Sequence, residues 1–225
     1  MNIKIIFTYI FLFLIVISCK KDAGSISLHE NYFPLENGRF VEYDVTSITH
    51  NVAAGIPETT NYVLKTVVGD TIIDNSGRIA RKFSRWIFNV NENKFIIKDL
   101  WTAIIDQNRA ELVEENERII KLVFSPSLKK VWDMNAFNSR TSVESKYENI
   151  HNSASIGSFT FDSTVTVVEE KFENLIEFRK KYEIYAKKVG LIYKCFKVFE
   201  ISSGDTLNPL VGTEIYYKIR NYGIE

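Results

Sequence analysis

The sequence has little of what catalytic and metal sites are usually built from. Its 225 residues include two cysteines and three histidines. His29, His50 and His151 do not stand at metal-ligand spacing from one another or from a cysteine, so the sequence predicts no zinc site. It has no glycine-rich phosphate loop and no paired-carboxylate motif, and nothing in it brings His151 together with Ser163 as a triad would require. We therefore expect a protein that is not an enzyme and uses no cofactor.

An excess of charge of either sign is also missing. Lys and Arg total 28, and Asp and Glu total 28, so the formal net charge is zero. Nucleic-acid binding depends on clustered Lys and Arg side chains. A near-neutral chain offers no such electrostatic support, and we expect no nucleic-acid partner.

The first apolar run is too short to span a bilayer. It covers the 13 residues from Ile5 to Ile17, whereas a transmembrane helix needs about 20. A basic start at Lys4 and the small residue Ser18 flank this run, which is the pattern of a cleaved signal peptide over residues 1–18. Residues 16–19 (VISC) fit the bacterial lipobox, in which the cysteine, here Cys19, receives lipid. The alternative is an uncleaved N-terminal anchor helix.

The chain after Cys19 predicts a short tether and one domain. Residues 19–30 are mostly polar or small and read as the lipidated tether. Residues 31–225 have a size that suits a single domain. With Cys19 lipidated, Cys195 has no partner for a disulfide, and its apolar surroundings predict a small buried hydrophobe.

Strand signals dominate this domain. Aromatic residues make up 13% of the sequence, and aromatic side chains favour pleated sheets. From Phe40 onward the apolar residues recur with period two, and polar turns follow at short intervals, at residues 74–77, 89–93 and 106–108. We expect an all-β antiparallel meander that forms a curved sheet or open barrel, lipocalin-like or a similar half-barrel.

Two segments allow more than one interpretation. Residues 111–118 could form a helix, but Glu111 and Glu115 would then repel each other four residues apart. A hairpin that turns near Glu115 and Asn116 is preferred, with its acidic residues in solvent. Residues 175–187 fit both helical and strand periodicity, and the neighbouring strands favour a strand.

Three segments resemble a group of envelope lipoproteins. They are residues 32–43 (YFPLENGRFVEY), 126–138 (PSLKKVWDMNAFN) and 182–194 (YEIYAKKVGLIYK). The first is similar to a YFPLxxGxxWxY opening, with Val41 where that pattern has Trp. The others are similar to a WxxNAxN segment and to an ExYAKxVGLVYK element. Together they resemble an uncharacterised family of Bacteroidetes-type envelope lipoproteins.

The resemblance implies a compartment and no reaction. Surface-export tags in such bacteria carry an acidic cluster, whereas Lys20, Lys21 and Asp22 include one acid. The resemblance therefore favours the periplasmic face of the outer membrane over the cell surface.

Two functions remain for such a domain. The first is a membrane-tethered, non-catalytic binding module for an apolar small molecule or lipid, with Trp86, Trp101 and Trp132 as candidates to line the cavity. The alternative for these tryptophans is packing in the core. The second function is a structural or interaction protein that docks on another envelope protein, for example through an exposed strand edge.

Overall fold

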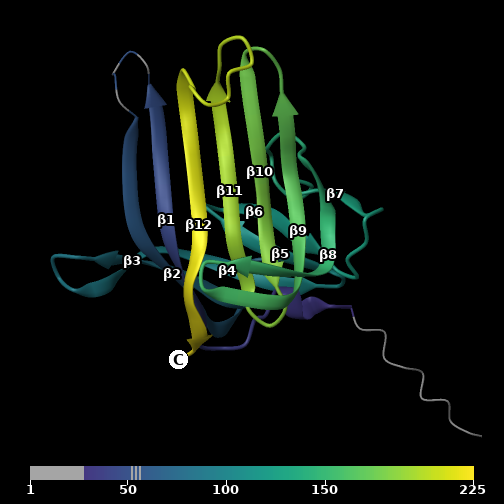
Figure 1. Cartoon of the computed structure of the whole chain (residues 1–225). Coiled ribbons are helices and arrows are strands. Elements are labelled where there is room, and N and C mark those ends of the chain that lie inside the picture. The colour runs from purple at the N-terminus through teal and green to yellow at the C-terminus, as the bar shows by residue number, and fades with distance from the viewer. Residues whose placement is uncertain (1–27, 52, 54, 56) are drawn as a thin grey trace, which may run out of the picture.

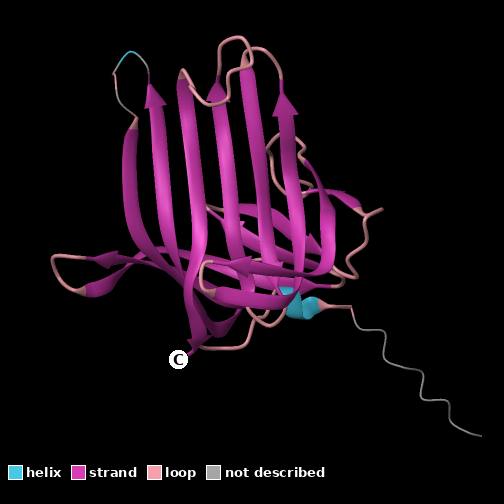
Figure 2. Cartoon of the chain, viewed as in Figure 1, coloured by secondary structure: helices cyan, strands magenta, loops and turns pink. Residues whose placement is uncertain are grey.

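The protein is a nearly closed, barrel-shaped sheet of antiparallel strands, which confirms the predicted all-β class (Figures 1 and 2). The computed structural model describes residues 28–51, 53, 55 and 57–225. The predicted signal peptide, Cys19 and most of the tether lie outside these residues. A short 3₁₀ turn, η1 (Glu30–Tyr32), precedes the first strand.

Twelve strands follow in chain order. They are β1 (Arg39–Asn51), β2 (Glu58–Ile73), β3 (Ile79–Asn89), β4 (Lys94–Asp106), β5 (Arg109–Glu114), β6 (Glu117–Val123), β7 (Val131–Asp133), β8 (Glu144–Ile156), β9 (Phe159–Glu173), β10 (Glu177–Ala186), β11 (Gly190–Glu200) and β12 (Val211–Ile224). Their order in the sheet is β6-β5-β4-β3-β2-β1-β12-β11-β10-β9-β8-β7. Two meanders, β1–β6 and β7–β12, therefore join through the pairing of the first strand with the last. In Figure 1, β1 and β9–β12 stand upright, and β4–β6 cross behind their lower halves.

The predicted turns and the ambiguous strand are confirmed. The β2–β3 hairpin turns at Asp74, whose Oδ1 accepts hydrogen bonds from the backbone N–H groups of Ser76 and Arg78 at 2.9 and 2.8 Å. The β5–β6 hairpin turns at Glu115 and Asn116, with φ of 50° and 64°, the left-handed conformations that tight hairpins need. Most of the segment that also fitted a helix is strand β10, which begins at Glu177.

The expectation that the acids of residues 111–118 lie in solvent was wrong for Glu111. This side chain is 0% exposed. It accepts hydrogen bonds from Arg109 Nε and, at 3.1 Å, from Arg78 Nη1, and Arg118 Nε lies 3.7 Å away. The hairpin turns as predicted, but the side chains of Arg78, Arg109 and Arg118 surround Glu111, shield it from solvent and compensate its charge.

The two ends of the sheet meet along a seam that side chains complete. The Ile120 N–H donates to Met134 O at 2.9 Å, and the Ile120 carbonyl accepts from Trp132 Nε1 at 3.2 Å. Asn138 Nδ2 donates to Arg118 O at 2.8 Å. The segment 132–138 thus satisfies backbone groups of the β6 edge, groups that would otherwise offer a site for strand addition.

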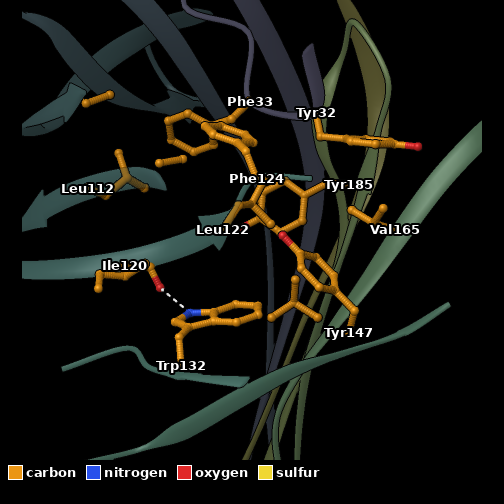
Figure 3. Packing of buried hydrophobic residues seen from close by; sticks show 13 residues of the cluster. Tyr32, Phe33, Leu112, Ile120, Leu122, Phe124, Trp132, Tyr147, Val165 and Tyr185 are labelled. Carbon is orange, nitrogen blue, oxygen red and sulfur yellow. Dashed lines mark hydrogen bonds between the residues drawn. The ribbon is translucent and has the colours of Figure 1, made fainter. Parts of the chain in front are cut away.

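Two groups of buried apolar residues fill the barrel. The first surrounds the seam (Figure 3) and contains Tyr32, Phe33, Leu122, Phe124, Trp132, Tyr147, Val165 and Tyr185, among others. The second lies between β1, β2, β11 and β12 and contains Val41, Tyr43, Val45, Leu64, Ile192 and Ile219, among others. Cys195 is buried as predicted. Within the described part of the chain, no helix is long and apolar enough to span a membrane.

The seam predicts a larger cost for one tryptophan substitution than for another. Trp132→Phe removes a buried N–H donor and leaves the Ile120 carbonyl without it, so we expect the free energy of unfolding to fall by about 1–3 kcal/mol. Trp86→Phe is the matched control, because Trp86 Nε1 donates to Ser84 Oγ at 3.0 Å on a half-buried surface; we expect a loss below about 1 kcal/mol. Urea unfolding of a chain that starts at Lys20 measures both. Equal losses would contradict the role given to the seam.

Candidate functional site

The candidate site is a cavity inside the barrel. Its volume is about 90 Å³, and its apolar wall includes Phe33, Leu35, Val68, Phe83, Leu112 and Leu191. Strand alternation directs Val68, Phe83, Leu112 and Leu191 inward, whereas Phe33 and Leu35 reach the cavity from the segment before β1. An engineered cavity of about 150 Å³ holds benzene. The present cavity is smaller and has room for an apolar group of only a few carbon atoms.

A cluster of charges lies at one side of this cavity. Lys121 extends from β6 to Glu183 on β10, with 3.0 Å between Nζ and Oε1. Lys194 on β11 is the register partner of Glu183 and places its Nζ 3.3 Å from the same oxygen. The Tyr185 hydroxyl donates to the other oxygen, Glu183 Oε2. One carboxylate is therefore shared between two ammonium groups and a phenol.

Burial and pairing together set the protonation of this cluster. Burial alone raises the pKa of Glu183, but Lys121, Lys194 and the Tyr185 hydroxyl outweigh it and lower that pKa to about 2. Burial likewise opposes the charge of Lys121, and Glu183 and Glu169 outweigh it, so its pKa is raised. For Glu169, burial outweighs Lys121 at 3.7 Å, and its pKa is raised. Glu183 and both lysines are therefore charged at neutral pH, at a desolvation cost of several kcal/mol for each ion.

Arg85 and Trp101 form another part of the cavity wall. The Arg85 guanidinium lies 4.1 Å from the centre of the Trp101 ring. It donates to Asp99 Oδ2 at 2.8 Å and to the Tyr217 hydroxyl at 3.1 Å. Arg85 is thus held by Asp99 and Tyr217, and its guanidinium lies over the indole of Trp101.

The three tryptophans named from the sequence lie in different places. Trp101 lines the cavity. Trp132 packs in the buried group around the seam, in contact with Tyr147, whose ring centre is 5.0 Å away. Trp86 borders a separate groove together with Lys65 and Phe95. The structure thus gives Trp132 the packing role that the sequence left open for it.

The segment before β1 packs against the barrel and brings His29 close to His151, which lies on β8. Tyr32 is fully buried, and its hydroxyl is hydrogen-bonded to His151 Nδ1 at 2.6 Å and to Ser163 Oγ at 2.7 Å. The His29 and His151 rings are 4.5 Å apart. The fold therefore brings His151 and Ser163 together, which the sequence could not show. Both are hydrogen-bonded to the Tyr32 hydroxyl, and they do not form a catalytic triad with each other. No group of three or more potential metal ligands occurs among the described residues.

Sequence reasoning missed the charged residues of the cavity. Lys121 interrupts the apolar run of residues 119–123, and Glu183 and Lys194 lie in the third segment that carries the family resemblance. A charge inside an otherwise apolar strand was the available signal. Its meaning depends on which charge faces it across the barrel, and the sequence does not show that pairing.

The cluster predicts a specific pH dependence. Glu183→Gln leaves Lys121 and Lys194 without their shared carboxylate, so at pH 7 we expect the free energy of unfolding to fall by about 3–5 kcal/mol. The carboxylate pKa is depressed from 4.5 to about 2 in the folded state. Its contribution is therefore full above about pH 5 and is lost as the pH falls toward 2.

Urea unfolding between pH 7 and pH 3 measures this difference. The gap between wild type and Glu183→Gln should narrow on acidification. The control Glu177→Gln removes an exposed partner of Arg179, and should cost about 0–1 kcal/mol. A gap that stays constant down to pH 3 would show that Glu183 is not ionised in the folded protein.

Comparison with known proteins finds distant structural matches only. No family model matches the chain, and no curated protein matches its sequence. Of the solved structures, a candidate lipoprotein from Parabacteroides distasonis ATCC 8503 has 14% identity and a TM-score of 0.44, covering 85% of this chain and 98% of its own. A candidate exported protein with a YmcC-like fold from Bacteroides fragilis NCTC 9343 has 10% identity and a TM-score of 0.45, covering 84% and 98%.

Proposed function

We propose that the protein is a lipid-anchored envelope lipoprotein whose barrel is a non-catalytic binding module for a small apolar ligand. The observation that carries the binding role is the cavity, because its apolar wall meets a cluster of buried charges. Small-molecule sites combine a mostly apolar surface with a few placed polar groups. A volume of about 90 Å³ limits the enclosed part of the ligand to a few carbon atoms, so a lipid would insert only one end.

The lipid anchor is proposed from the sequence. Residues 1–19 carry the signal-peptide and lipobox pattern. Leu28 O accepts a hydrogen bond from the Ser125 N–H at 2.8 Å, so a tether from Cys19 would lead to the barrel just after β6. We place the protein at the outer membrane, on its periplasmic face, because the residues after Cys19 lack an acidic cluster.

A second candidate function is docking on another envelope protein. Two hairpin loops at one end of the upright strands carry exposed apolar side chains, including Leu175 (70% exposed) and Leu207 (88% exposed). The loops contact each other through the Gly204 N–H, which donates to Leu175 O at 3.0 Å. They lie at the end opposite η1 (Figure 1), so they would point away from the anchor. The β6 edge is a less suitable docking surface, because the segment 132–138 covers it.

Native mass spectrometry tests the binding role. A chain that starts at Gly24, purified gently from cells, should carry a small-molecule mass that disappears on denaturation. Val68→Phe should abolish that mass, because Val68 is buried in the cavity wall and a larger side chain fills the space. Val90→Phe is the control, since Val90 lies in an exposed turn. A wild-type protein free of any ligand would favour the docking function, and crosslinking in whole envelopes would follow.

Metabolic labelling tests the anchor. Radiolabelled palmitate should be incorporated into the wild-type chain, and Cys19→Ala should remove the label completely because no other residue fits the lipobox position. Cys195→Ala should keep full labelling, since that thiol is buried. Labelling that persists in Cys19→Ala would refute the lipoprotein assignment.

A further inference from the structure

We propose that the protein has a second ligand site, a groove on the outer face of the sheet that binds a carbohydrate. The groove is separate from the cavity inside the barrel, so this inference goes beyond the proposed binding of an apolar ligand and does not rest on it. Its basis is a pair of tyrosine rings that lie beside hydroxyl groups and charges of both signs.

The groove lies across β1, β12 and β11, and its volume is about 440 Å³. Small-molecule sites occupy about 300–1,000 Å³. Tyr193 in the groove directly precedes Lys194, which lines the cavity, and Tyr216 and Lys218 in the groove flank Tyr217, which also lines the cavity. Successive side chains of a strand point to opposite faces of a sheet, so the groove lies outside the barrel.

The β8–β9 hairpin forms one wall of the groove. It lies across the lower ends of the upright strands (Figure 1), and Ser155, Ile156 and Gly157 line the groove from its tip. Gly157 has φ of 62°, and a Cβ there would lie 3.2 Å from Lys218 Cε. Glycine therefore lets the hairpin approach β12 closely, and the hairpin turns an open sheet face into a hollow.

The protein holds both tyrosine rings of the groove in place. The Tyr216 hydroxyl donates to Glu214 Oε2, and the centre of its ring lies 5.5 Å from Lys197 Nζ. The ring centre of Tyr193 is 5.8 Å from that of Tyr182. Side chains that are ordered before binding lose little conformational freedom when a ligand arrives.

Hydrogen-bonding groups surround these rings. The described lining carries one charge of each sign, Asp44 and Lys218, which are register partners on β1 and β12. Asp44 also pairs with Arg220 at 2.9 Å on the exposed surface, but a carboxylate has about four acceptor positions and can accept further hydrogen bonds. The hydroxyl groups of Thr46 and Ser155 lie in the same lining.

This combination of groups matches a sugar ring. One face of a pyranose presents C–H groups that can pack on an aromatic ring, and its rim carries hydroxyl groups that both donate and accept hydrogen bonds. A carboxylate beside an ammonium group supplies an acceptor and a donor at neighbouring positions. A nucleic acid would require clustered cations, and a lipid acyl chain would leave these polar groups without partners.

A glycan array tests the proposal. The protein is the full chain in phosphatidylcholine nanodiscs that contain a fluorescent lipid, and empty fluorescent nanodiscs are the blank. The array carries neutral oligosaccharides of hexoses and N-acetylhexosamines. We expect binding to a subset of glycans that share one sugar, and absence of binding to every glycan would overturn the proposal.

Two variants then locate the site by calorimetry with the best glycan of the array. Tyr193→Ala should weaken binding at least about tenfold, because it removes one stacking ring. Asp44→Asn should weaken binding about three- to tenfold, because a charged acceptor forms the stronger hydrogen bond. The Asp44 side chain is 56% exposed, so this second variant tests the groove even where Tyr193→Ala does not fold. Phe172→Ala is the control, since Phe172 is 43% exposed and outside the described lining of the groove.

A cavity variant separates this inference from the proposed function. Val68→Phe should leave glycan binding unchanged, because Val68 lies in the cavity wall. Glycan binding that is lost in Val68→Phe would place the sugar in the cavity and overturn the assignment of the groove. Binding that keeps its full strength in both Tyr193→Ala and Asp44→Asn would overturn that assignment as well.

Discussion

The ion pair between Lys121 and Glu183 is the interaction on which the interior of the protein depends. It connects β6, at one end of the sheet, with β10, in the other meander. Because both groups are buried, removing Glu183 would leave Lys121 without its nearest counter-charge in the interior. The pair therefore requires the two meanders to curve toward each other, and it holds a polar group beside an otherwise apolar cavity. Structure and candidate function both rest on this contact.

The seam is a second contact that joins the two ends of the sheet. The Ile120 and Arg118 backbone groups on β6 are satisfied by Met134, Trp132 and Asn138 instead of by a full neighbouring strand. Side chains take part in this contact because the neighbouring strand, β7, is short and spans only Val131–Asp133. It also covers part of the β6 edge, so strand addition at that place is disfavoured.

The three segments that resemble the envelope lipoproteins meet in space. The first contributes Phe33 and Leu35 to the cavity wall, and the third contributes Glu183, Tyr185 and Lys194. The second forms the seam. Gly38, in the first segment, has φ of 79°, and a Cβ there would lie 2.9 Å from Glu225 O, so the motif glycine also allows the C-terminal residue to pack closely. These motifs therefore describe how one barrel closes and what lines its interior.

The sequence by itself determined the local structure. Period-two alternation, the turn at Asp74 and the Glu115-Asn116 hairpin each follow from interactions between near neighbours, and each was predicted correctly. The tertiary structure decided everything that joins distant residues, since the partner of a side chain across the barrel is set by register and curvature. It buried Glu111 among three arginines, placed Trp101 at the cavity and Trp132 at the seam, and brought Lys121 to Glu183. A charge inside an apolar strand has no meaning until its counter-charge is known, and only the closed sheet supplies that pairing.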